Sequence, residues 1–138
     1  ELIVAAIERG VSVVPVPGPS AVIAALAVSG LPTDQFLYVG FLPRRKGQKQ
    51  RLLSSLVDEP RTIVAFETPH RLKESLSDIK EILGDRRLSV CRELTKVHEE
   101  IFRGRVSQAG EHFVDPRGEF SLVVEGKTRA WSKFQERS

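Results

Sequence analysis

Short apolar segments with the length of buried strands alternate along this chain with segments of helical periodicity. Such alternation indicates an α/β fold in which helices flank a sheet. Helical crossovers favour parallel neighbours, and the last two strands can pair antiparallel, so we expect a mixed, mostly parallel sheet. The predicted strands cover residues 11–16, 36–42, 61–66, 88–94, 100–106 and 120–125, and the predicted helices cover residues 2–9, 21–28, 46–57, 69–83 and 107–113.

The segment 69–83 carries the clearest helical signal. Thr68 is suited to cap this helix, and Pro69 is suited to its first position. Its apolar positions recur at spacings of 4, 3 and 4 residues, at Leu72, Leu76, Ile79 and Leu83.

Composition narrows the class of protein. The chain has 138 residues with 41% hydrophobic and 28% charged residues, which is typical of one globular domain. The apolar run Ala21–Val28 is too short to cross a bilayer, so no membrane partner is expected. A single cysteine, Cys91, excludes a disulfide framework and predicts a cytoplasmic protein. The net charge of +3 permits a nucleic-acid partner without requiring one.

The first residues predict that the chain is a piece of a longer protein. The chain contains no Met and opens with Glu1 followed by the apolar run Leu2–Ile7. We therefore expect a remnant helix at 1–10 that belongs to an N-terminal domain, an α/β domain at 11–126 and a polar tail at 127–138.

Ligands of open α/β sheets gather beyond the carboxyl ends of the strands. Segments rich in Pro, Gly and polar residues follow the predicted strands, and we expect them to converge on one edge. Ordinary loops have the same composition, so loops remain the alternative interpretation. The segments are 17–20, 40–43, 67–71, 92–96 and 124–127.

Several well-known motifs are absent. Glu125–Thr128 resembles the end of a phosphate-binding loop, but Ser121 stands where the first glycine is needed. Gly18 to Val22 lacks the closing glycine of a hydrolase nucleophile elbow. The sequence has no G-x-G-x-x-G, and its three histidines lack metal-ligand spacing, so neither a nicotinamide cofactor nor a metal site is predicted.

Charged side chains at the strand ends are candidates for chemistry. Glu67 ends a buried strand, where a carboxylate needs a partner, and either Arg71 or Arg92 could supply it. His70 and Arg71 open a helix, where they either face solvent or contact a phosphate or substrate. Arg92, Glu93 and the neighbouring Lys96 form either a salt-bridged surface or part of a site.

A basic segment precedes these candidates. It places five cations within eight residues and contains no acid. It is either a solvated helix face or a surface that binds RNA phosphates. The cations are Arg44, Arg45, Lys46, Lys49 and Arg51.

Six sequence pieces, in this order along residues 1–126, carry a family resemblance. They are Val14–Ala21 (VPVPGPSA), Ser29–Asp34 (SGLPTD), Gly40–Arg44 (GFLPR), Phe66–Arg71 (FETPHR), Arg92–Lys96 (RELTK) and Gly118–Phe120 (GEF). Together they resemble the tetrapyrrole methylase superfamily. The most similar branch is that of bacterial enzymes that methylate a ribose 2′-hydroxyl of a cytidine in small-subunit ribosomal RNA.

This resemblance implies a two-domain, cytoplasmic enzyme, expected as a homodimer, that binds S-adenosylmethionine between its domains. The chain looks like the second domain of that fold, and a Gly-rich loop of the missing first domain would lie just before Glu1. The partners implied are the N-terminal domain and small-subunit ribosomal RNA. The alternatives are a methyltransferase of small tetrapyrroles and a non-catalytic binding or dimerisation module.

The resemblance also implies roles for individual residues. The implied cofactor contacts are Ser20, Ala21, Phe41, Leu42, Phe66, Val123, Val124 and Glu125. The implied groups that handle a proton or orient the substrate are Glu67, His70, Glu93 and Lys96. The implied RNA contacts are Arg44, Arg45, Lys46, Lys49, Arg71 and Arg92.

Overall fold

The computed structural model describes residues 8, 21–93, 99–113 and 117–127. Its strands are β1 (Phe36–Phe41), β2 (Thr62–Glu67), β3 (Arg87–Arg92), β4 (Glu100–Arg105) and β5 (Phe120–Val124). Its helices are α2 (Ala21–Ser29), α3 (Lys46–Ser55), the short 3₁₀ helix η1 (Pro69–Arg71), α4 (Leu72–Leu83) and α5 (Val106–His112). Each of these elements overlaps a predicted one. The segment predicted at 11–16, all of 2–9 except residue 8, and nearly all of the tail lie outside the described residues.

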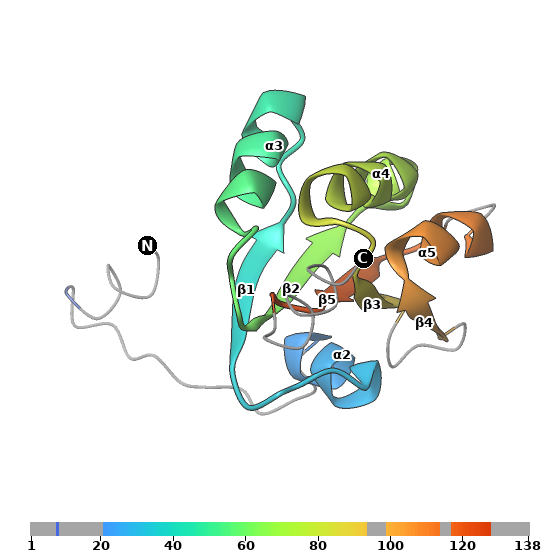
Figure 1. Ribbon diagram of the computed structural model, residues 1–138. Helices are drawn as coiled ribbons and strands as arrows, with labels where there is room; N and C mark the ends of the chain where they lie inside the picture. Colours follow the sequence, from blue (N-terminus) through green and yellow to red (C-terminus); the bar gives the residue numbers. More distant parts are fainter. Residues whose placement is uncertain (1–7, 9–20, 94–98, 114–116, 128–138) are drawn as a thin grey trace, which may run out of the picture.

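The strands form one sheet in the order β1-β2-β5-β3-β4 (Figure 1). β1 and β2 run parallel, whereas β5 is antiparallel to both β2 and β3, and β4 is antiparallel to β3. The prediction of a mixed sheet flanked by helices is confirmed, but the expectation that most neighbours run parallel is wrong. The segment between β3 and β4 is too short for a helical crossover, which forces an antiparallel hairpin.

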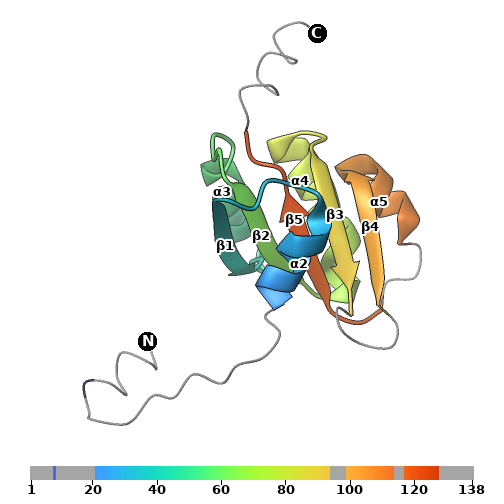
Figure 2. The same cartoon turned by 90° about the horizontal axis from the view of Figure 1, so that it is seen from below.

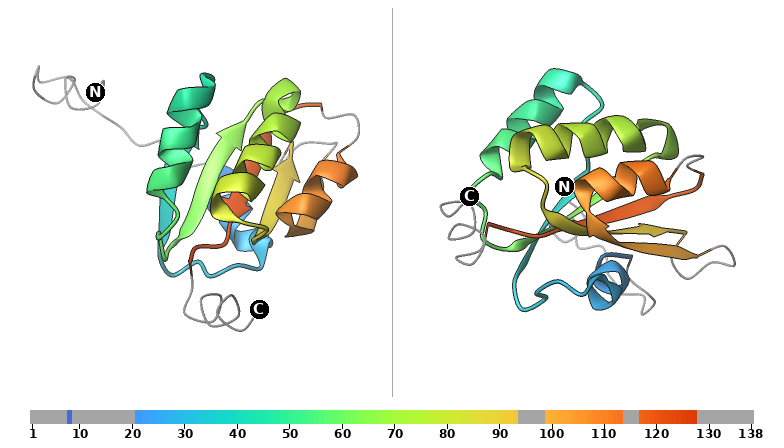
Figure 3. Two further views of the ribbon diagram at one scale, coloured as in Figure 1. Left: turned by 45° about the horizontal axis from the view of Figure 1, so that its top comes forward. Right: turned by 45° about the vertical axis from the view of Figure 1, so that its right-hand side comes forward.

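Helices cover the two faces of the sheet unequally. α3, α4 and α5 lie together on one face, and α2 lies alone on the other (Figure 3). The larger core fills the first interface, with Leu53, Leu76 and Leu122 among its members. The smaller core joins α2 to the middle strands through Leu26, Cys91 and others. Seen from the α2 side, this helix crosses β5 and β3 and leaves β1 uncovered (Figure 2).

The start of the clearest helix differs from the expectation. Pro69 begins η1, and α4 follows directly at Leu72. The side chain of Thr68 makes no capping hydrogen bond, so that prediction is wrong. The backbone N–H of Thr68 donates to Glu67 Oε1 at 2.8 Å, and its hydroxyl lies 3.5 Å from the same oxygen. Thr68 therefore supports the carboxylate of the preceding residue and not the helix.

Among the described residues, no helix is long and apolar enough to span a membrane.

Candidate active site at the carboxyl edge of the sheet

Three strands end at one edge of the sheet. Glu67 of β2 and Arg92 of β3 both pair with Phe120, the first residue of β5. β1 runs parallel to β2 and therefore ends at the same edge. The predicted convergence thus holds for the described parts of 40–43, 67–71 and 92–96. We call this edge, with the side chains that follow it, the carboxyl edge.

The end of β5 lies at the opposite edge. Val124 pairs with Ile63 near the start of β2, which is about 13 Å along the strand from Phe120. The expectation that 124–127 converges with the other strand ends is therefore wrong. Antiparallel insertion of β5 brings its beginning, Gly118 to Phe120, to the carboxyl edge instead. Gly118–Phe120 is one of the six pieces that carry the family resemblance, so the sequence already marked this segment. Composition alone does not reveal the direction of the strand that follows it.

Three of the predicted cofactor contacts, Val123, Val124 and Glu125, are buried. Val123 lies in the core beneath α2, and Val124 lies in the core beneath α3 to α5. Glu125 is 8% exposed, and its Oε2 lies 3.6 Å from Nε of Arg87. Val123, Val124 and Glu125 are thus buried and lie away from the carboxyl edge, whereas Phe41 lies at it.

A bulge in β1 turns an aromatic ring outward. The register of β1 against β2 shifts between Tyr38 and Gly40, so that Phe41 lies opposite Phe66 instead of Glu67. Gly40 has φ +74°, which glycine adopts without the steric cost of a side chain. Bulges near active sites commonly re-aim a side chain in this way.

The re-aimed ring joins an exposed aromatic surface, formed by Tyr38, Phe41 and Phe66. The rings of Tyr38 and Phe41 meet that of Phe66 edge to face, with centroids 5.4 and 5.5 Å apart. Tyr38 is 48% exposed and Phe41 is 60% exposed. Leu42 does not join them: it lies in the core, and its N–H donates to the carbonyl of Phe66 at 3.1 Å.

The carboxylate of Glu67 is buried and fully engaged. Its Oε1 accepts from the N–H of Thr68 and lies 3.4 Å from Nε of Arg71. Its Oε2 accepts from the hydroxyl of Ser75 at 2.5 Å. Of the two partners that the sequence left open, the structure selects Arg71. Both oxygens have donors, so Glu67 is placed to orient Arg71.

Lys49 is not part of the exposed basic surface. It is 1% exposed, and its ammonium group lies 2.8 Å from Asp78 Oδ2 and donates to Ser75 Oγ at 3.2 Å. The prediction that Lys49 contacts RNA is therefore wrong, because its inward position on α3 directs it against α4. Arg44, Arg45 and Lys46 are exposed, as a phosphate-binding surface requires.

A second arginine at this edge is held by a different carboxylate. Arg92 donates from Nη2 to Glu100 Oε2 at 2.7 Å, and the other oxygen of Glu100 lies 2.9 Å from Nε2 of His112. Sequence reasoning missed Glu100 and His112. Their pairing follows from the β3–β4 hairpin, which places Arg92 opposite Glu100.

Glu93 shapes the backbone beside this arginine. It has φ +52°, its N–H donates to the carbonyl of Glu119 at 2.9 Å, and its Oε1 accepts from the N–H of Glu119 at 3.0 Å. His70 is exposed on η1. Ser20 and Lys96 lie outside the described residues, and Ala21 is exposed at the first position of α2.

Comparison with solved structures finds the same fold in other proteins. Diphthine synthase superimposes with a TM-score of 0.67 at 12% identity, covering 99% of this chain and 57% of that one. Uroporphyrin-III C-methyltransferase from Thermus thermophilus, solved with S-adenosylhomocysteine, gives a TM-score of 0.57 at 20% identity, covering 89% and 57%.

Sequence relatives are more similar. The chain is 52% identical over 122 residues to ribosomal RNA small subunit methyltransferase I of Thermotoga maritima, covering 87% of this chain and 54% of the relative. It is 46% identical over 128 residues to the protein of that name from Halalkalibacterium halodurans, covering 91% and 44%. The chain thus spans about half the length of these curated relatives. The family model of the tetrapyrrole (corrin/porphyrin) methylases matches residues 1–110. With that match over most of its length, the chain belongs to the tetrapyrrole methylase family.

Proposed function

We propose that this chain forms the C-terminal domain of an S-adenosylmethionine-dependent enzyme that methylates a ribose 2′-hydroxyl of a cytidine in small-subunit ribosomal RNA. The observation that carries the proposal is the identity of 46 to 52% to ribosomal RNA methyltransferases, extending over about nine-tenths of the chain. Because these relatives are about twice as long, the proposed enzyme includes an N-terminal domain. We call this form the two-domain protein.

The carboxyl edge fits the proposed cofactor. Phe41 and Phe66 present apolar ring surface of the kind on which an adenine ring packs. A Cβ atom at Gly118 would meet the carboxylate of Glu93, so the missing side chain leaves room for that carboxylate beside the N–H of Glu119. These residues, together with Ser20 and Ala21, would hold the cofactor, which supplies a methyl group on a sulfonium when bound.

Basic side chains fit the proposed RNA partner. Arg44, Arg45 and Lys46 are exposed between the end of β1 and the first turn of α3. Clustered cations bind RNA phosphates with release of counterions, and such contacts position the RNA without reading its sequence. Arg71 follows the end of β2 and lies beside the same edge.

The proposed reaction also needs a group that accepts the proton of the ribose hydroxyl. Both oxygens of Glu67 accept hydrogen bonds inside the protein, so we assign it an orienting role. His70, Glu93 and Lys96 remain the candidates for the acceptor. The protein would align the hydroxyl with the methyl group and exclude water from the cleft.

A tetrapyrrole substrate is the second candidate. The structural similarity to uroporphyrin-III and cobalt precorrin-4 methyltransferases stays at 18 to 22% identity, which supports the shared fold alone. A tetrapyrrole methylase would not need the exposed basic segment.

We also propose that the enzyme is a homodimer and that it is located in the cytoplasm. Size-exclusion chromatography of the two-domain protein tests whether it is a dimer.

Calorimetric titration with S-adenosylmethionine tests the cofactor assignment. Binding by both this chain and the two-domain protein would place a preformed site in this domain. Binding by the two-domain protein alone would show that the cleft needs both walls. Absence of binding by either would refute the methyltransferase proposal.

A methyl-transfer assay tests the substrate. Small ribosomal subunits that lack the modification should accept labelled methyl from the two-domain protein on a cytidine ribose. Labelling of a tetrapyrrole without RNA would favour the second candidate instead.

Charge reversal of the basic segment separates RNA binding from cofactor binding. Changing Arg44, Arg45 and Lys46 to Glu should weaken binding of small subunits and flatten its salt dependence, because fewer phosphate contacts form. The affinity for S-adenosylmethionine should stay unchanged. Loss of cofactor affinity in this variant would contradict the assignment of these residues to RNA.

A further inference from the structure

Buried charges of alternating sign connect the middle of the α3–α4 interface to the carboxyl edge. Asp78 of α4 lies against Lys49 of α3, with Oδ2 2.8 Å from Nζ. Lys49 also donates to the hydroxyl of Ser75 at 3.2 Å, and that hydroxyl donates to Glu67 Oε2 at 2.5 Å. Glu67 Oε1 in turn lies 3.4 Å from Nε of Arg71. We call Asp78, Lys49, Ser75 and Glu67 the buried relay.

Stability alone does not account for this relay. Lys49 is 1% exposed, Asp78 5% and Glu67 1%. Removing such ions from water costs several kcal/mol for each, and apolar side chains of the same size commonly give equal or greater stability. A buried ion pair is therefore better explained by the geometry that it imposes. In this relay the hydrogen bonds run from Lys49 through Ser75 to Glu67, and so toward Arg71.

Ser75 determines that direction. Its single hydroxyl proton goes to Glu67, while its oxygen accepts from the ammonium group of Lys49. This arrangement leaves the hydroxyl one orientation and holds Oε2 of Glu67, whereas Arg71 contacts Oε1. Ser75 is fully buried, so water does not compete for these bonds.

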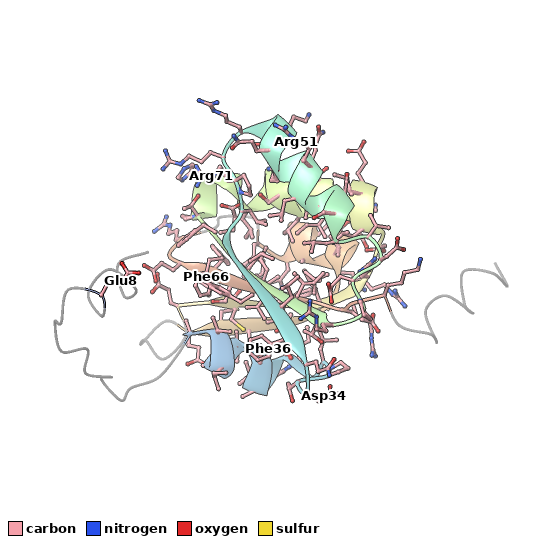
Figure 4. All side chains as sticks on the ribbon, turned by 90° about the vertical axis from the view of Figure 1, so that its left-hand side faces the viewer. Glu8, Asp34, Phe36, Arg51, Phe66 and Arg71 are labelled. Atoms are coloured by element: carbon pink, nitrogen blue, oxygen red, sulfur yellow. The ribbon has the colours of Figure 1, made fainter. Side chains whose placement is uncertain are left out.

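Arg71 is where the relay reaches the surface. Glu67 engages only its Nε, and its two terminal nitrogens find no acceptor among the residues that the structure describes. The side chain is 16% exposed and follows the exposed His70 on η1. Figure 4 places Arg71 at the end of β1 opposite Asp34 and Phe36, on the side that α3 and α4 cover. A planar guanidinium fixed by one edge presents its other donors to an oxyanion with little loss of side-chain entropy.

We propose that the buried relay is a positioning device that holds the guanidinium of Arg71 ready for a phosphate of the RNA substrate. Lys49, Ser75 and Asp78 are positioning residues, and Arg71 is the residue that contacts the phosphate. The inference rests on the proposed function for the identity of the ligand. It goes beyond that function by assigning roles to three buried residues that touch no substrate.

A double-mutant cycle in the two-domain protein tests the coupling. Arg71→Ala should raise KM for small ribosomal subunits about tenfold with kcat nearly unchanged, which corresponds to about 1.4 kcal/mol of lost binding. Ser75→Ala should raise the same KM by about threefold to fivefold. In the double variant, KM should equal that of Arg71→Ala alone, because the relay acts only through Arg71.

Two controls distinguish positioning from general destabilisation. Ser77→Ala changes an exposed serine of the same helix and should leave KM at the wild-type value. Lys49→Met removes the ammonium group but keeps the stem, and it should reproduce the KM effect of Ser75→Ala even at temperatures where both variants are fully folded. Additive effects of Ser75→Ala and Arg71→Ala, or a change confined to the affinity for S-adenosylmethionine, would overturn the proposal.

A second measurement does not depend on RNA. In protein labelled with ¹⁵N-arginine, Arg71 should give a protected Nε–H resonance, identified by its absence in Arg71→Lys. Ser75→Ala should abolish that protection, whereas Ser77→Ala should preserve it. Protection that survives Ser75→Ala would refute the relay itself. Protection could also be lost in Ser75→Ala while the wild-type two-domain protein fails to methylate RNA. That result would refute the proposed function and leave the buried relay supported.

Discussion

At the scale of single residues, periodicity predicts burial better than charge does. The five cations of the basic segment suggest one exposed surface, yet Lys49 is buried. Lys49 precedes Leu53 by four residues and Leu56 by seven, so it occupies the apolar face of α3. The helical spacing contained this information. The partners, Ser75 and Asp78, lie 26 and 29 positions away and become visible only once α3 and α4 pack together.

The contact between Gly118 and Glu93 supports a prediction at the same scale. Gly118 has φ +82°, and a Cβ atom there would meet the carboxylate group of Glu93. Gly118→Ala should therefore lower the free energy of unfolding by at least about 1–2 kcal/mol, measured by urea denaturation. Displacement of Glu93 should also free the N–H of Glu119 and weaken cofactor binding.

Gly110→Ala is the matched control for this substitution. Gly110 lies within α5, where an added Cβ meets nothing within 4 Å. Alanine has the higher helix propensity, so this variant should gain up to about 1 kcal/mol. Equal stability of the two variants would show that the close approach at Gly118 has no energetic weight.

At the scale of elements, the sequence predicts where strands and helices lie more reliably than how they are directed. The ten described elements all match predicted segments, because apolar periodicity is a local property. The direction of β5 depends on its insertion between β2 and β3, and no local pattern encodes that. The bulge at Gly40 is likewise set by pairing with β2, and it determines that Phe41 faces outward.

The packing of α2 supports a prediction about Cys91. This thiol is fully buried beneath α2, and burial raises its pKa, with smaller opposing contributions from a hydrogen bond with Ser89 and the charge of Arg103. Native Cys91 should therefore resist alkylation by iodoacetamide at pH 8.5, because the thiolate is the reactive form. Arg103 donates to the carbonyl of Val28 at the end of α2 at 2.7 Å, so Arg103→Ala should accelerate the labelling.

The same shift gives this thiol a pH-dependent contribution to stability. Its pKa is higher in the folded than in the unfolded chain, so the native state retains the proton at alkaline pH. This contribution is full below the unfolded pKa of about 8.5 and declines as the pH rises through that value toward the folded pKa. The wild type should thus lose stability relative to Cys91→Ala between pH 8 and 10 in parallel urea titrations. A constant difference over that range would contradict the assignment.

At the scale of the whole molecule, the two edges of the sheet differ in what they hold. The carboxyl edge collects exposed aromatic rings and the partly exposed side chains of Arg71 and Arg92, with the buried carboxylate of Glu67 beneath Arg71. At the opposite edge, the chain packs around the buried side chain of Arg86, which was not among the predicted site residues. Arg86 is 2% exposed, and burial lowers its pKa, opposed by the nearby charges of Glu125 and Asp58.

Arg86 joins three segments that are distant in the sequence. Its Nε donates to the carbonyl of Leu83 at 2.9 Å, Nη1 to that of Glu125 at 3.1 Å and Nη2 to that of Val57 at 2.8 Å. These carbonyls belong to the end of α4, the segment after β5 and the turn after α3. The planar guanidinium group carries donors on three nitrogens and so reaches all three carbonyls at once, whereas a lysine has its donors on one nitrogen.

Arg86→Lys should therefore destabilise the chain strongly although it preserves the charge. Loss of two or more charge-assisted bonds to buried carbonyls should lower the free energy of unfolding by about 3 kcal/mol or more. Arg87→Lys is the control next to it, because the Arg87 side chain is 60% exposed and surface substitutions usually stay within about 0.5 kcal/mol. Urea denaturation of both variants measures the difference. Equal free energies of unfolding for Arg86→Lys and Arg87→Lys would contradict this prediction. The guanidinium group would then contribute nothing measurable to joining the three segments.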